Sequence, residues 1–317
     1  MKLAKIYKIA YMFGIKNDPR GEKEVKDFLK NEGKSYNSLS DKEKKYFDTE
    51  KLENPYADTR IIFDTKEEIK TILVGIDMEI GEILLADRLK EKGKKIDLVF
   101  AHHPEGKAYA NFYDVMDMQA DIFKKFGVAI SAAEDMTSKR KREVAEKVMP
   151  ANHYRTYDAA KLLNISIMNA HTPADNCVAT YLQKKFDSEK PRTVGDIIDM
   201  LMQEPEYQEY SRRGLEPIVL VGDKKRKAGK IFVDMTGGTE GPKDIYKRLS
   251  LAGVDTVVGM HFSADHKKAI EEANLNAVIA GHISSDSLGM NILFDEIEKQ
   301  AGKLKIYETS GFIRFKR

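Results

Sequence analysis

The sequence predicts an α/β protein with two similar α/β lobes from an internal duplication, preceded by a helical N-terminal extension. Short apolar runs, typical of strands buried on both faces, alternate with segments of helical spacing. One strand–helix–strand unit also recurs near the other end of the 317-residue chain. We therefore expect an extension over 1–65, a first lobe with a helical middle over 66–213 and a second lobe over 214–317.

The first 65 residues differ from the rest in composition. Between Lys16 and Glu53, ten basic and ten acidic residues alternate with little apolar periodicity. This pattern predicts solvated helices, and a solvated charged face is its ordinary interpretation. The first helix must bury one apolar face, which carries Leu3, Ile6, Ile9, Ala10 and Phe13. We expect the extension to pack on the outside of the first lobe or across a subunit contact, and to supply no ligand.

The first repeat unit begins at residue 71. The run TILVGID over 71–77 predicts a buried strand, and helical spacing follows over 80–91 until Gly93 stops the helix. IDLVFAHH over 96–103 predicts the next strand. This is one β-α-β unit.

The second repeat unit has the same order. KIFVDMT predicts a strand over 230–236, and a helix and a strand follow over 243–251 and 254–261. An aspartate ends the first strand of each unit and a histidine ends the second, which gives the pairs Asp77 with His102 and Asp234 with His261. Any two β-α-β units look alike at this level, so chance similarity stays open. The expected later elements are a helix over 266–273, a strand over 276–282, a helix over 288–299 and a terminal strand.

The middle of the chain is mostly helical in pattern. The segment NISIMNAH over 164–171 predicts a strand, and EPEYQEYSRRG over 204–214 reads as a loop between the lobes. The expected helices lie over 119–126, 138–148, 177–186 and 193–203.

Three predicted strands end in histidine, and polar residues follow each at once. The segments are AHHPEG over 101–106, NAHTPADN over 169–176 and GHISSD over 281–286. Ligands in open α/β sheets bind beyond the carboxyl ends of strands. His171 and Asp175 are four residues apart, as are His282 and Asp286, so each pair faces one point if a helix follows the strand.

These groups predict a metal site where three strand ends meet at one sheet edge. Imidazole with carboxylate suits Zn²⁺, Mn²⁺, Fe²⁺, Co²⁺ or Ni²⁺. Six candidate groups exceed the need of one four-coordinate ion, so two ions sharing a carboxylate are expected. A single histidine at a strand end is usually only a hydrogen-bonded surface group, and the metal interpretation depends on all three ends together.

Three further features have two interpretations each. Asp77 is a candidate base or a carboxylate behind the ligands, or else a helix cap. His266 is a candidate acid/base or extra ligand, or else an exposed helix histidine. The turn over 236–241 could form a backbone nest for phosphate, or else only a tight turn.

The motifs AHHPEG, NAHTPADN and GHISSDSLG, in that order, resemble the YbgI-like family, also called the NGG-one-interacting-factor-three family. Its members are often described as type-two GTP cyclohydrolase I homologues. The resemblance covers about residues 70–317. It implies a two-metal site in a cleft between two similar lobes of a ring-shaped homo-oligomer, commonly a hexamer. The implied metal ligands are His102, His103, Asp175, His282 and Asp286, with His171 at the edge of the site as a catalytic candidate.

The sequence also departs from that family. Asp286 stands where the family has glutamate, and a carboxylate one methylene shorter would draw two ions together or hold only one firmly. Glu105, Gly106 and Lys107 follow the HHP motif in place of bulky apolar residues, which changes the floor of the cleft.

Charge and composition exclude some classes of protein. The 53 Lys and Arg residues nearly balance 51 Asp and Glu residues, which argues against binding nucleic acid by bulk charge. The basic run over 139–142 reads as a solvated helix face. One cysteine permits no intrachain disulfide, and no apolar run is long enough to span a membrane. We see no signal peptide and expect a cytoplasmic protein.

The expected function is that of a dinuclear metal-dependent hydrolase acting on a nucleotide or phosphorylated small molecule. Its cyclohydrolase aspect follows from the family resemblance alone, because neither fold nor ligands can assign a reaction. The alternative is a non-catalytic metal-binding adaptor or regulator with the N-terminal extension as partner surface. A catalytic ion keeps an open coordination position and a structural ion does not, which separates the two.

Overall fold

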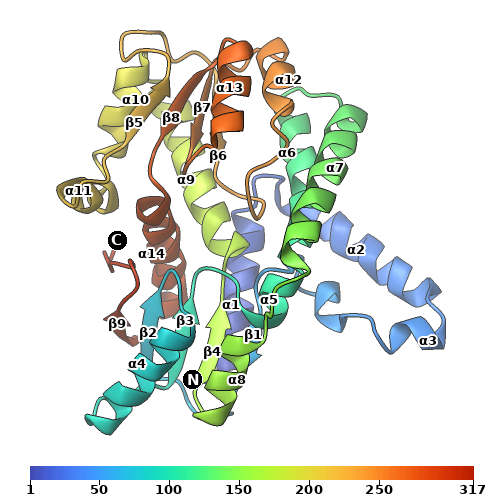
Figure 1. Cartoon of the computed structure of the whole chain (residues 1–317), viewed down its shortest axis with the longest axis vertical. Coiled ribbons are helices and arrows are strands. Elements are labelled where there is room, and N and C mark those ends of the chain that lie inside the picture. Colours follow the sequence, from blue (N-terminus) through green and yellow to red (C-terminus); the bar gives the residue numbers. More distant parts are fainter.

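The computed structural model describes residues 1–317 and contains two separate β-sheets, one in each lobe (Figure 1). In the first sheet the strands lie in the order β1 (Ile61–Phe63), β4 (Ser166–Asn169), β3 (Leu98–Ala101), β2 (Thr71–Gly75) and β9 (Lys305–Glu308). In the second sheet the order is β5 (Ile218–Val221), β8 (Asn276–Ile279), β7 (Thr256–Gly259) and β6 (Ile231–Asp234).

The two sheets have corresponding strand orders. In each, three parallel strands are arranged in reverse of their chain order, and a strand that precedes all three pairs antiparallel at the edge. Parallel pairing requires crossover connections, which explains why the β2, β3, β6, β7 and β8 segments are short, apolar and separated by helices. The predicted α/β class is confirmed, and the shared strand order fits an internal duplication.

Helices cover the sheets and join the lobes. Figure 1 shows α4 and α8 beside the first sheet at the bottom of the view, and α10, α12 and α13 beside the second sheet at the top. The helices that precede β4 are α1 (Leu3–Lys16), α2 (Glu22–Ser38), α3 (Asp41–Lys44), α4 (Ile80–Glu91), α5 (Gly106–Ala110), α6 (Met118–Lys125), α7 (Ile130–Val148) and α8 (Arg155–Leu162). Those that follow are α9 (Thr172–Glu189), α10 (Val194–Leu201), α11 (Pro205–Arg212), α12 (Ile245–Leu251), α13 (Ala264–Glu272) and α14 (His282–Ala301). Two short 3₁₀ helices span Thr49–Leu52 and Phe112–Asp117.

Helices α9 and α14 form the centre of the molecule, where they pack against each other between the sheets (Figure 1). Gly289 of α14 makes this close approach possible, because a Cβ there would lie 2.4 Å from the carbonyl oxygen of Ala174 in α9. Asp175 is next to Ala174, and Asp286 lies one turn before Gly289. The close crossing therefore brings these two carboxylates toward each other.

Helix α1 is part of the main core, so the expectation that it packs on the outside of the first lobe is wrong. Leu3, Ile6, Ile9 and Ala10 are buried in one apolar cluster with residues of the first sheet and of α14. Near its end, α1 passes the first turn of α9, where a Cβ on Gly14 would lie 2.7 Å from the Pro173 Cβ. The charged remainder, α2 and α3, projects from the body as an arm (Figure 1), and only Val25 of these two helices is buried.

Three further elements differ from expectation. The segment expected to be a loop over 204–214 contains α11, whose Tyr207 and Tyr210 are buried against the body. The terminal strand β9 pairs with β2, so the chain returns from the second lobe to the first sheet. Helix α14 begins at His282 rather than near Leu288, which places His282 and Asp286 on consecutive turns of one helix.

No helix of the structure combines the length and the apolar character that crossing a membrane requires.

Candidate metal centre

The candidate ligands lie at strand ends and in the helices that follow. His102 and His103 come directly after β3, and His171 caps α9 after β4. His282 opens α14 after β8. The strand ends belong to two sheets that face each other, not to one sheet edge as expected. Asp175 and Asp286 lie one turn into α9 and α14, so the central helix pair supplies both carboxylates.

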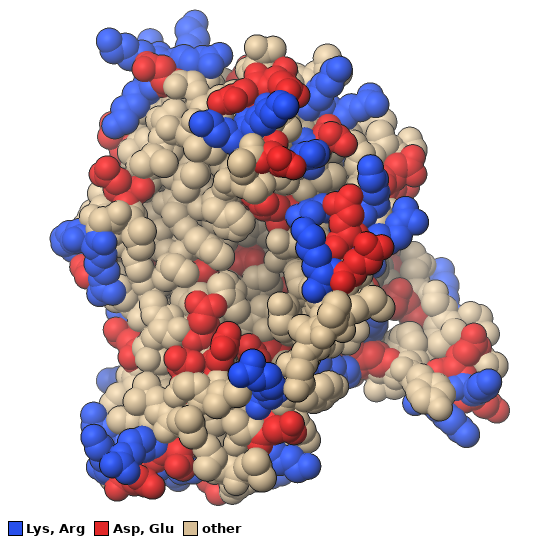
Figure 2. Space-filling model, viewed as in Figure 1, with Lys and Arg blue, Asp and Glu red and all other residues tan.

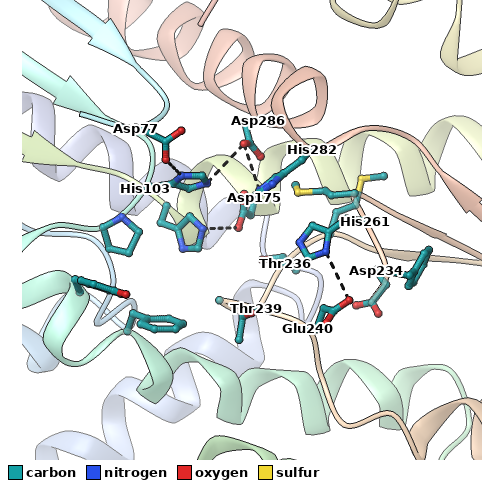
Figure 3. A pocket seen from close by; sticks show the side chains of 18 of the residues that line it. Asp77, His103, Asp175, Asp234, Thr236, Thr239, Glu240, His261, His282 and Asp286 are labelled. Carbon is teal, nitrogen blue, oxygen red and sulfur yellow. Dashed lines mark hydrogen bonds and ion pairs between the residues drawn. The ribbon is translucent and has the colours of Figure 1, made fainter. Parts of the chain in front are cut away.

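Three groups of side chains could each hold a metal ion, and two of these groups share Asp286. Figure 3 shows one of the two, in which His103 and His282 lie beside the Asp286 carboxylate. His102 Nε2 lies 3.3 Å from Asp175 Oδ1 and 3.5 Å from Asp286 Oδ1. On the other side of the same carboxylate, the Nε2 atoms of His103 and His282 lie 3.7 and 3.5 Å from Asp286 Oδ2. Each oxygen of Asp286 therefore faces a different ligand set, as in a carboxylate that bridges two ions.

These residues fit divalent ions. His102 Nε2, Asp175 Oδ1 and both carboxylate oxygens of Asp286 are buried and have no hydrogen-bond partner. Buried polar atoms almost always have a hydrogen-bond partner, so four unpaired polar atoms in one place indicate that they bind a ligand such as a metal ion. Ligands at about 2.0–2.2 Å from a tetrahedral ion lie about 3.3–3.6 Å from one another, close to the separations observed here.

The three candidate ligand histidines of the first lobe are oriented through their Nδ1 atoms. His103 Nδ1 donates to Asp77 Oδ1 at 2.6 Å, and His171 Nδ1 donates to Asp58 Oδ2 at 2.8 Å. His102 Nδ1 lies 3.3 Å from the Ala170 carbonyl oxygen. These acceptors fix the proton on Nδ1 and leave the Nε2 lone pair free for a metal, which is the usual arrangement behind metal-bound histidine.

Asp77 and His171 occupy different places in this arrangement. Asp77 accepts a hydrogen bond from the candidate ligand His103. This contact fits the interpretation of Asp77 as a carboxylate that supports the ligands from behind. His171 is grouped with His102 and His103, with all ligand atoms within 4.8 Å, and its Nε2 lies 3.6 Å from Asp175 Oδ2. The geometry thus makes His171 a candidate ligand, in addition to the residues that the resemblance implies.

Asp58 is a functional candidate that the sequence did not reveal. It belongs to the N-terminal extension, is fully buried, and accepts hydrogen bonds from His171 and from the Thr172 hydroxyl at 2.6 Å. The Asn169 side-chain amide, at the end of β4, donates to the Asp58 carbonyl. No sequence motif marks Asp58. It lies 113 residues before His171 in the chain, and only the tertiary fold brings the two side chains together.

Replacing Asp58 with asparagine should weaken metal binding by about 10–100-fold, the usual effect of losing a partner behind a metal ligand. The amide keeps the volume but can present an N–H to His171 Nδ1, which disturbs the orientation and tautomer of the ring. Competition with a chelator measures the affinity. Asp64→Asn is the matched control, because Asp64 lies in the same segment and pairs only with Lys66. Equal affinity in both variants would show that Asp58 does not position His171.

The histidines and carboxylates of the cluster shift one another's pKa values. Burial alone would lower the pKa of His102, but Asp286 and Asp175 raise it well above its ordinary value. Burial alone would raise the pKa of Asp286, yet His102 and the neighbouring histidines lower it to about 2. Asp286 is therefore ionised at neutral pH and available as a ligand.

A cavity of about 360 Å³ adjoins the cluster and is lined by both lobes (Figure 3). The side chains of His103 and His282 are 24% and 39% exposed, whereas that of His102 is fully buried. One ligand set is therefore enclosed and the other opens toward the cavity.

The second lobe contributes a wall of acidic and imidazole groups opposite the cluster. His261 Nδ1 lies 3.5 Å from Glu240 Oε1, and the ring centroids of His261 and His282 are 5.0 Å apart. Burial alone would raise the pKa of Glu240, but hydrogen bonds from His261 and the Ser263 amide lower it to about 2. Burial raises the pKa of Asp234 to about 7. Asp234 and His261 occupy the same positions in the second repeat unit as Asp77 and His102 in the first. The sequence showed this correspondence but predicted no role for either residue.

His266 does not join the candidate ligands, so its role as a catalytic or ligand residue stays a prediction. It is buried, its Nδ1 is 2.9 Å from the Tyr246 hydroxyl, and it does not line the cavity. Helix α13 packs on α12 at this point, which turns the ring toward Tyr246 and away from the cluster. Its Nε2 remains 3.9 Å from Glu240, behind the wall.

The glycine-rich turn after β6 is shaped by packing. Gly237 and Gly238 have φ values of +94° and +89°, and a Cβ on either would lie 2.7 Å from Gln119 or Val115. The Gln119 side chain donates at 2.8 Å to the carbonyls of Gly237 and Thr239. The tight-turn interpretation accounts for these glycines without a phosphate.

Comparison with known proteins identifies the fold. The sequence matches no known family model, and no curated protein is significantly similar to it. A solved NIF3 superfamily protein from Sphaerobacter thermophilus is 28% identical, with 80% of this chain and 91% of that chain covered and a TM-score of 0.70.

Two more distant structures have TM-scores below 0.5. Reduced HcgD from Methanocaldococcus jannaschii is 17% identical, with 79% of this chain and 87% of that chain covered and a TM-score of 0.48. Protein YbgI, of unknown function, is 14% identical, with 90% of this chain and 97% of that chain covered and a TM-score of 0.44. The assignment therefore rests on the Sphaerobacter protein, together with the three motifs and the sheet order. The chain has the fold of the NIF3 superfamily, and these similarities support the YbgI-like family that its histidine motifs resemble.

Proposed function

We propose that this chain is a dinuclear metal-dependent hydrolase of small molecules. The observation that carries the proposal is the position of Asp286, whose two oxygens face separate ligand sets. His102, Asp175 and Asp286 would hold the enclosed ion, and His103, His282 and Asp286 the ion next to the cavity. Zn²⁺, Mn²⁺, Fe²⁺, Co²⁺ and Ni²⁺ all suit such ligands. Divalent ions here would supply the Lewis acidity that hydrolysis of an ester, amide or phosphoester requires.

The chain's own residues would prepare the site for this chemistry. Asp77 and Asp58 hold His103 and His171 with Nε2 toward the cluster. The cavity accepts a small substrate next to the partly exposed His103 and His282. This opening supports catalysis over a purely structural metal site, in which every ligand position would be closed. Opening of a purine ring, the reaction in the family's cyclohydrolase description, remains one member of this reaction class.

The alternative is a metal-binding adaptor, for which the projecting α2–α3 arm would be the partner surface (Figure 1). We further propose a homo-oligomer, with the hexamer of the resemblance as its size, and a cytoplasmic location. The buried Cys177 is the only cysteine, which fits a reducing compartment.

Turnover by protein loaded with Zn²⁺ or Mn²⁺ tests the hydrolase proposal. A panel of carboxylic esters, amides, cyclic amides and phosphoesters should contain a compound that the loaded protein hydrolyses. Activity should fall to background on chelation and in Asp286→Asn. Fully loaded protein that hydrolyses no member of the panel would contradict the proposal and favour the adaptor.

A further inference from the structure

The cavity next to the metal centre has an unusual charge composition. Its 21 lining residues include no Lys and no Arg, although the whole chain has 53 of them. They do include seven carboxylates, and in Figure 2 the hollow between the lobes is tan with red patches inside it. The acidic lining residues are Asp77, Glu79, Glu105, Asp175, Asp234, Glu240 and Asp286. Seven carboxyl groups outnumber the four positive charges of two divalent ions, although burial raises the pKa of Asp234 and of Glu105 to about 7.

Two cationic side chains near the cavity, Arg140 and Lys107, are engaged elsewhere. Arg140 reaches the wall from outside, where its Nε donates at 3.2 Å to the backbone carbonyl of Glu240, and its guanidinium pairs with Glu143. Lys107, two residues beyond the acidic Glu105, pairs with Asp48 at 2.7 Å. Neither cation lines the cavity. Phosphate sites in proteins are usually built with Arg or Lys, and the lining of this cavity offers neither.

Asp234 is the carboxylate best placed to meet a ligand. It ends β6 and lines the cavity, and its side chain makes no hydrogen bond or ion pair in the structure. Glu240, its neighbour on the wall, shares its charge with His261.

Aromatic rings accompany these carboxylates on both sides of the cavity. Tyr109 and Phe112 of the first lobe stack with ring centroids 5.8 Å apart. Phe262 and Tyr246 of the second lobe meet edge to face at 6.5 Å. Ring faces together with carboxylates are the ordinary means by which proteins hold organic cations.

We propose that the cavity binds a substrate with an organic cation, such as an ammonium, amidinium or guanidinium group, directed at Asp234 and the aromatic wall. This inference rests on the proposed function, because the reactive end of the substrate would lie toward Asp286 and the metal ligands. It narrows the substrate class away from the nucleotides and phosphorylated molecules that the sequence suggested. The charge of such a cation would offset that of Asp234, the wall carboxylate for which the structure shows no ion pair.

Calorimetry with matched pairs of probes tests this inference on the full-length, Zn²⁺-loaded protein. The pairs are benzamidine with benzamide, and phenethylamine with 2-phenylethanol, so that each cation has a neutral molecule of similar shape. We expect each cation to bind at least about tenfold more tightly than its neutral partner, the effect of one favourable charge interaction. Phenyl phosphate, the anionic probe, should bind more weakly than benzamidine and should lose its binding when the metal is removed.

Two variants locate the effect. Asp234→Asn should weaken benzamidine binding about tenfold and leave benzamide unchanged. Asp265→Asn is the matched control, since Asp265 lies in the same lobe, outside the cavity, and is exposed with only Lys243 as a partner. Equal binding of cations and neutral partners, a preference for phenyl phosphate, or an Asp234 variant that behaves like the control would each overturn the inference.

Metal content measured on the same samples separates this inference from the proposed function. Protein that takes up no metal but still prefers the cations contradicts the proposed function alone. Protein with full metal and no preference for cations contradicts this inference alone.

Discussion

Replacing Asp286 with asparagine is expected to remove both metal ions at once. Each of the two ligand sets around Asp286 consists of three side chains. Asp286 is the only residue that belongs to both of these sets. An amide oxygen is a weaker ligand than a carboxylate and its nitrogen is none, so neither ion keeps a complete set. We expect the affinity for both ions to fall by more than about 100-fold, more than loss of a group behind a ligand would cause.

The matched control is His282→Ala, which removes a ligand from the exposed set alone. This variant should keep one ion per chain. Metal-to-chain ratios after dialysis measure both results, and circular dichroism shows whether each variant stays folded. Asparagine suits the test better than alanine, because Asp286 is fully buried in α14 and a smaller side chain would leave a cavity. An Asp286→Asn variant that retains one tightly bound ion would show that the two sites do not share this carboxylate.

The second large effect concerns stability. Replacing Ile6 with alanine should lower the free energy of unfolding by about 2–5 kcal/mol, the range for truncating a buried aliphatic side chain. Ile6 is fully buried in the cluster that α1 forms with the first sheet and α14. Lys5→Ala, at the exposed neighbouring position, should change the stability by less than about 0.5 kcal/mol.

Urea denaturation of both variants measures the difference. Deletion of residues 1–65 should then give a chain that does not fold, since it removes α1, strand β1 and the Asp58 contact to His171. A folded deletion variant with its full metal content would show that the extension is dispensable, as the charge pattern alone suggests.

The strands and the chemistry at their ends could be predicted because both are local in the sequence. A run such as TILVG is buried on both faces wherever it pairs, and polar ligands can follow only where such a strand ends. The spacing of four between His282 and Asp286 likewise has meaning as soon as a helix follows the strand. These features led to the family that the comparisons support and to the residues that gather around Asp286.

The supports of the site could not be predicted, because they depend on contacts between distant segments. Asp58 reaches His171 only through the pairing of β1 with β4, and a lone aspartate in a charged segment gives no warning of it. The burial of α1 depends on α14, which follows it by more than 260 residues. Helix α11 was not expected because its proline and glutamates and the glycine that follows it are typical of a loop, whereas its buried Tyr207 and Tyr210 hold it against the body.

The short carboxylate of Asp286 illustrates how packing changes what a motif means. The sequence alone suggests that an aspartate in place of the family's glutamate draws the ions together or holds only one. In the structure, Gly289 lets α14 approach the backbone of α9 closely. Asp286 therefore faces both ligand sets although its side chain is short. The loss of one methylene is thus offset by the position of the helix.

Crystals grown with Mn²⁺ or Zn²⁺ and measured at the absorption edge of the metal test the central claim most directly. The account predicts two anomalous peaks about 3.5–4 Å apart, the spacing of two-metal sites, with one oxygen of Asp286 bound to each. His102 and Asp175 should complete one site, and His103 and His282 the other. A single peak, or two peaks of which one has no bond to Asp286, would contradict the shared dinuclear centre.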